Sequence, residues 1–79
     1  MKTETVQPKR IRFGDTRTTI ERNKQILKLL AEDKRPKEIA EQLGINLFTI
    51  RWAIEWMRNQ NGYHTIAALV ATAIRGNLI

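Results

Sequence analysis

The sequence predicts an all-α fold in which four short helices form a single domain. Three observations lead to this fold class. Four segments place apolar residues at the 3.6-residue period of an amphipathic helix. Residues typical of helix ends separate these segments. No segment alternates apolar and polar residues in the manner of a half-buried strand.

The first two helices are expected on either side of a charged turn at residues 33–35. The first begins near Thr18, since Thr18 and Glu21 have the spacing of a capping box. The second begins at Pro36, because the amide hydrogen that proline lacks has no helical acceptor at that position. It ends before Gly44, which can adopt the left-handed conformation that closes a helix.

The third helix is expected over residues 47–60, with Asn46 as its N-cap. Its apolar side consists of Ile50, Ile54 and Met57. The fourth helix begins after Thr65, a second candidate cap, and ends at Gly76. Residues 18–79 are therefore assigned to one domain.

Residues 1–17 are expected to form a flexible basic arm outside this domain. The segment contains Pro8, Gly14 and alternating charges, and it has no apolar face of either period. Its basic cluster consists of Lys9, Arg10 and Arg12. This cluster either follows the phosphate backbone of a nucleic acid or only keeps the chain soluble.

The composition of the chain limits the kinds of partner and cofactor that we expect it to bind. The 79 residues carry a formal net charge of +6, which favours a polyanionic partner. The chain has no cysteine and a single histidine, so we expect no disulfide, no structural zinc site and no cofactor. No apolar run approaches the roughly 18 residues that span a bilayer, and none follows the N-terminus as a signal. The expected location is the cytoplasm, without a membrane partner.

An enzymatic function is not expected. The chain contains neither serine nor cysteine to act as a nucleophile, and it has no glycine-rich loop to bind a phosphate group. Its carboxylates fall at helix positions that are expected to face solvent. The single histidine, His64, lies between the third and fourth helices and is interpreted as a loop or capping residue. A binding function is therefore favoured.

A helix-turn-helix motif is expected at the centre of the chain, where residues 37–46 join two amphipathic helices through a very short turn. The small side chain of Ala40 lets the helices approach closely, Gly44 permits the bend, and Ile45 fills the core between them. In this motif the second helix enters the major groove of DNA. The fold class is thus a four-helix helix-turn-helix domain.

Several segments of the chain, the motif included, resemble the LuxR/GerE family of DNA-binding domains. The resemblance extends from about Thr19 to Ile79, and it is carried by residues 25–32, residues 37–40 with 43–45, residues 49–51 and the ending at residues 74–79. The chain differs at Asn23, where the family usually has glutamate, and at Trp52, Ala53 and Glu55, where small or basic residues are usual. The resemblance implies a stand-alone domain whose third helix contacts DNA and whose fourth helix mediates dimerisation.

The resemblance and the helix positions together give candidate site residues. Arg51 matches a basic position at the DNA surface of the family, and Lys37 and Thr49 match positions that usually contact phosphates. Glu55 either accepts a hydrogen bond from a cytosine amino group or repels the DNA backbone. The full DNA-binding set is Lys9, Arg10, Arg12, Lys37, Asn46, Phe48, Thr49, Arg51, Trp52 and Glu55, and the dimer set is Ala67, Ala71 and Ile74.

An aromatic stripe leaves a second function open. Phe48, Trp52 and Trp56 recur every four residues, roughly opposite the apolar side of the third helix, so we expect them to face outward. Alternatively, Trp56 turns into the core or the arm covers the stripe. The leading hypothesis is a transcriptional regulator that binds double-stranded DNA as a homodimer. The rival is a protein-interaction module, such as an anti-activator or adaptor, that binds its partner through this stripe.

Overall fold

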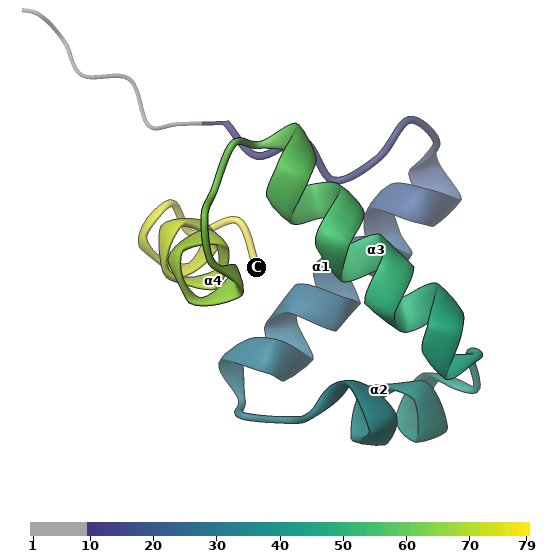
Figure 1. Ribbon diagram of the computed structural model, residues 1–79. Coiled ribbons are helices and arrows are strands. Elements are labelled where there is room, and N and C mark those ends of the chain that lie inside the picture. The colour runs from purple at the N-terminus through teal and green to yellow at the C-terminus, as the bar shows by residue number, and fades with distance from the viewer. Residues whose placement is uncertain (1–9) are drawn as a thin grey trace, which may run out of the picture.

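Four helices form the described part of the chain, residues 10–79 of the computed structural model (Figure 1). They are α1 (Arg17–Ala31), α2 (Pro36–Leu43), α3 (Leu47–Gln60) and α4 (Ile66–Arg75). These residues contain no strand, and none of their helices is long and apolar enough to cross a membrane. The predicted all-α fold with four helices is confirmed.

The turn between α2 and α3 has the local structure that the sequence predicts. Helix α2 begins at Pro36 and closes at Gly44, whose φ of 66° lies in the left-handed region. A residue with a Cβ atom adopts that region only at a cost of about 1 to 2 kcal/mol. Helix α3 follows at once, because the Asn46 side chain accepts a hydrogen bond of 2.7 Å from the Phe48 backbone N–H. The two helices are therefore held at a fixed angle by a very short connection.

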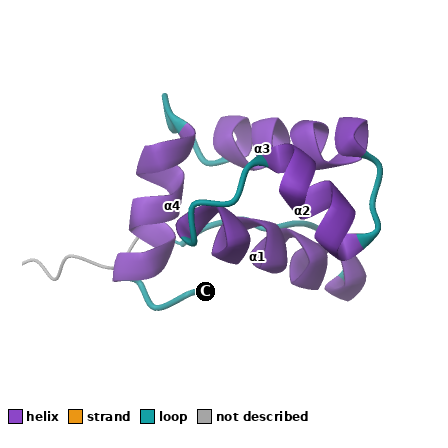
Figure 2. Cartoon of the chain, turned by 90° about the horizontal axis from the view of Figure 1, so that it is seen from below, coloured by secondary structure: helices purple, strands orange, loops and turns teal. Residues whose placement is uncertain are grey.

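Helices α1 and α3 form the centre of the molecule. Figure 2 shows them stacked one above the other, with α4 across one end of the pair and α2 in front. The predicted apolar side of α3 is confirmed, since Ile50, Ile54 and Met57 are all buried. They pack in one core with Ile26 and Leu27 of α1, and this core fixes which side of α3 faces solvent.

Residues 11–13 belong to this domain, so the prediction of a separate flexible arm is wrong for them. Ile11 and Phe13 are buried and form part of the core. Between them, the Arg12 backbone N–H donates to Asn61 Oδ1 at 2.7 Å, and the Arg12 carbonyl accepts from Asn61 Nδ2 at 3.0 Å. The Phe13 carbonyl accepts a hydrogen bond of 2.6 Å from Asn23 Nδ2. Two asparagines thus pair three backbone groups of a segment that has no secondary structure of its own.

The start of α1 also differs from the prediction. The helix begins at Arg17, and Thr16 caps it by accepting a hydrogen bond of 3.2 Å from the Thr19 backbone N–H. Thr18 therefore lies inside the first turn and does not form the predicted capping box with Glu21. Thr16 has the β conformation of an N-cap, which places its hydroxyl to accept the backbone N–H of the first turn.

Candidate nucleic-acid interface

The solvent-facing side of α3 carries most of the predicted site residues. Arg51, Trp52 and Glu55 are exposed, and Phe48 is the most exposed large apolar side chain, at 77%. Thr49 is half-buried beside them. Phe48, Trp52 and Glu55 lie on the opposite side of the helix from its core residues. Thr49 and Arg51 flank this side, so all five residues border one surface.

Two further candidates border this surface at its N-terminal end. Asn46 is exposed, and its side-chain oxygen is engaged in capping α3. Lys37 is exposed in the first turn of α2, the helix that lies beside the N-terminal end of α3 in Figure 1. Lys37 and the first half of α3 therefore belong to one side of the molecule.

The basic residues of the N-terminal segment lie at the other end of α3. Arg10 and Arg12 are exposed, but the Arg12 backbone is bonded to Asn61, the residue that ends α3. A helix of 14 residues is about 21 Å long, so these side chains emerge far from Asn46. The structure does not bring Arg10 or Arg12 beside Lys37, and Lys9 lies outside the described residues.

The aromatic stripe is only partly exposed. Phe48 and Trp52 face solvent as expected, and Trp52 is 55% exposed. Trp56 is half-buried and packs against the core, so the expectation that all three rings face outward is wrong for this residue. The rings of Trp52 and Trp56 are stacked, with centroids 6.4 Å apart and an interplanar angle of 27°. The exposed aromatic surface consequently comes from Phe48 and Trp52.

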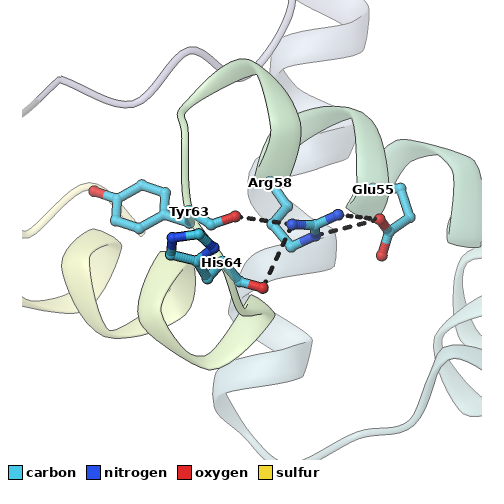
Figure 3. Close-up of polar contacts among 4 residues, drawn as sticks. All are labelled: Glu55, Arg58, Tyr63 and His64. Atoms are coloured by element: carbon cyan, nitrogen blue, oxygen red, sulfur yellow. Dashed lines mark hydrogen bonds and ion pairs between the residues drawn. The ribbon is translucent and has the colours of Figure 1, made fainter.

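Glu55 forms an ion pair with Arg58 on the same helix, α3. Its Oε1 atom accepts hydrogen bonds from Arg58, at 2.7 Å from Nη2 and 3.2 Å from Nε (Figure 3). The remaining Nη1 of Arg58 donates to the carbonyls of Tyr63 and His64 in the loop before α4. The sequence analysis did not single out Arg58, although its position three residues after Glu55 is a spacing at which helix side chains pair. Since Arg58 compensates the carboxylate, Glu55 repels a nearby phosphate less than an unpaired glutamate would.

A cleft of about 330 Å³ lies between α3 and the start of α1. Trp52 and Trp56 line it from α3, and Arg22 and Asn23 line it from α1. The remaining lining residues are Gly14, Asp15, Thr16 and Thr19. The sequence analysis did not single out Arg22, because its position beside the two tryptophans depends on how α1 crosses α3.

The predicted dimer residues line an apolar groove of about 390 Å³ between α4 and the end of α1. Ala67 and Ile74 are exposed, and Ala71 is half-buried. Leu30, Ala31, Ile66 and Val70 complete the lining, so every side chain of the groove is apolar. The predicted dimer residues therefore share one surface, which is separate from the exposed side of α3.

The described surface thus offers side chains for binding: an exposed arginine and two exposed aromatic rings on α3, with a lysine on α2. Comparisons of the chain with protein-family models, with curated proteins and with solved structures find no match. A functional assignment therefore depends on the residues and the geometry described above.

Proposed function

We propose that the protein is a transcriptional regulator that binds double-stranded DNA in the cytoplasm, with α3 in the major groove. The observation that carries this proposal is the exposed side of α3, which directly follows the tight turn after α2. In a helix-turn-helix, the N-terminal residues of the second helix contact base edges. The guanidinium of Arg51 can donate two hydrogen bonds to the O6 and N7 acceptors of a guanine. Phe48 and Trp52 offer apolar contacts to thymine methyl groups.

Charge and sequence resemblance support the same function. Lys37 and Thr49 lie beside the exposed face of α3, where the phosphates that flank a major groove would pass. The chain has a net charge of +6, and the pairing of Glu55 with Arg58 reduces repulsion at the centre of α3. The resemblance to LuxR/GerE domains supports the assignment of α3 as the recognition helix. In this proposal the protein acts by binding and not by catalysis.

Salt-dependent binding to DNA tests this function. We expect a mixed-sequence duplex to bind at low salt, with the logarithm of the association constant falling by about 2 to 4 per decade of salt, because each neutralised phosphate contributes about 0.9. Fluorescence anisotropy of a labelled duplex between 50 and 200 mM salt measures this slope, and elution from heparin provides an independent comparison. Absence of duplex binding at 50 mM salt would overturn the proposal.

We further propose that the apolar groove between α1 and α4 pairs two copies of the chain. Sedimentation is expected to show a dimer at tens of micromolar, on the order of the concentrations at which a weak interface is populated. Ala67→Glu should produce a monomer, because it places a charge in the groove. The matched control is Ala68→Glu, since Ala68 is an exposed neighbour that does not line the groove. A monomeric parent protein would contradict this proposal.

A second candidate function is an anti-activator or adaptor that binds another protein through α3. The exposure of Phe48 and Trp52 favours it, since adjacent exposed aromatic rings are typical of the centre of a protein interface. The net positive charge favours DNA instead. The two functions give different expected results for substitutions of Arg51 and Trp52.

A further inference from the structure

Arg22 differs from the other basic residues near α3 because a buried side chain orients it. Its Nε donates a hydrogen bond of 3.0 Å to Asn23 Oδ1. Asn23 is only 1% exposed, and its own Nδ2 donates to the Phe13 carbonyl at 2.6 Å. The guanidinium of Arg22 is therefore fixed through a buried amide to the core of the domain.

The outer edge of this guanidinium is available to a ligand. Arg22 is half-buried and lines the cleft between α1 and α3. Within residues 10–79 its Nη1 and Nη2 atoms have no hydrogen-bond acceptor, and it forms no ion pair, including with Asp15 on the same cleft. Four N–H groups consequently remain for a group that accepts several hydrogen bonds.

The surroundings of Arg22 fit a phosphate group that is attached to a sugar. The planar fork of an arginine matches two oxygens of a phosphate. The cleft also lies at the start of α1, where the helix dipole is positive; Asp15 lines the cleft just before the helix, and the first turn itself has no acidic residue. Across the cleft, Trp52 and Trp56 provide an apolar wall against which a sugar ring can pack.

The position of the cleft relates it to the DNA-binding face. Trp52 belongs both to the exposed side of α3 and to the lining of the cleft. Figure 1 shows α2 beside the N-terminal end of α3, and the start of α1 on the other side of α3, farther from the viewer. A helix in a major groove about 12 Å wide has one DNA strand along each of its edges. In the proposed complex, the strand that passes α2 is thus a different strand from the one that passes the start of α1.

We infer that Arg22 binds a backbone phosphate of DNA in this cleft, on the strand opposite the one that Lys37 contacts. The inference rests on the proposed function and adds a contact that holds α3 in the groove from its second edge. Because Asn23 orients the guanidinium before DNA binds, Arg22 loses little side-chain freedom in the complex.

The test compares neutral substitutions of Arg22 in the full chain, with a mixed-sequence duplex as the probe. Arg22→Gln and Arg22→Met should each lower the salt slope by about 0.9, which corresponds to roughly eightfold weaker binding at 0.1 M salt. Both substitutions are made because Met keeps the aliphatic length of the arginine side chain, so the packing of residue 22 is preserved even if Gln disturbs it. Circular dichroism melting is recorded for both. Arg22→Lys should retain the slope, because it retains the charge.

Arg75→Gln is the matched control, since it removes one positive charge from the last turn of α4, where the side chain is exposed and does not line the cleft. We expect it to leave the slope within about 0.3 of the parent value. An unchanged slope in folded Arg22→Gln and Arg22→Met, while the parent binds DNA, would overturn this inference and leave the proposed function intact. An equal loss in Arg75→Gln would also overturn it. A parent protein that does not bind DNA would overturn both.

Discussion

Replacing Phe13 with alanine is expected to destabilise the domain by about 3 kcal/mol, the range for removing a buried phenylalanine side chain. The ring is 7% exposed and belongs to the core, and Lys24 Nζ lies 5.4 Å from its centroid. For a domain of this size, the melting temperature should fall by roughly 12 to 24 °C. Thermal unfolding followed by circular dichroism measures the change.

Arg10→Ala is the control for this substitution, because Arg10 lies in the same segment with its side chain exposed. It should change the free energy of unfolding by less than about 0.5 kcal/mol. If Phe13→Ala melts at the temperature of the parent protein, residues 11–13 do not contribute to the core in solution, and the arm predicted from the sequence describes them better.

Substitutions of Arg51 and Trp52 are expected to separate the two candidate functions. Both side chains are exposed, so Arg51→Ala and Trp52→Ala should each cost less than about 1 kcal/mol of stability. If α3 contacts DNA, Arg51→Ala should weaken binding by about 1 to 3 kcal/mol through a base contact, or lower the salt slope by about one through a phosphate contact. Trp52→Ala should mainly reduce the preference among duplex sequences.

A protein-binding function gives the opposite pattern. The parent protein would then bind duplex DNA feebly, and Trp52→Ala would abolish binding of the partner protein while Arg51→Ala would reduce it less. Anisotropy with duplexes of several sequences and thermal melting of each variant decide between these results. A large loss of stability in Trp52→Ala would contradict both functions as argued here, because it would place the indole ring in the core.

The elements defined by short-range signals could be predicted from the sequence. Pro36 marks the start of α2, Gly44 its end, and Asn46 the start of α3, each through a constraint within a few residues of the chain. The exposure of Phe48 and Trp52 follows in the same way from the helical period. These features carry the candidate DNA-binding face.

The features that were missed depend on contacts between distant parts of the chain. Ile11 and Phe13 are only two apolar residues, separated by an arginine, so they show no period. The hydrogen bonds that hold this segment come from Asn23 and Asn61, which lie 10 and 49 positions from their partners Phe13 and Arg12. The inward orientation of Trp56, and the position of Arg22 beside it, likewise depend on how α1 crosses α3. Sequence periodicity describes one helix at a time and contains no such information.

The hydrogen bonds between Arg12 and Asn61 cannot form until the ribosome has added residue 61. The two residues are separated by 49 positions. At a synthesis rate of about 5 to 20 residues per second, residue 61 is added roughly 2 to 10 s after residue 12. During that interval Arg12 has left the peptidyl-transferase centre before the Asn61 amide that bonds its backbone exists. Asn23, which bonds Phe13, follows after only 10 positions, and the turn at Gly44 needs only its immediate neighbours. Arg12 is therefore translated early in the described part of the chain, but its backbone can form these hydrogen bonds only after most of the chain has been made.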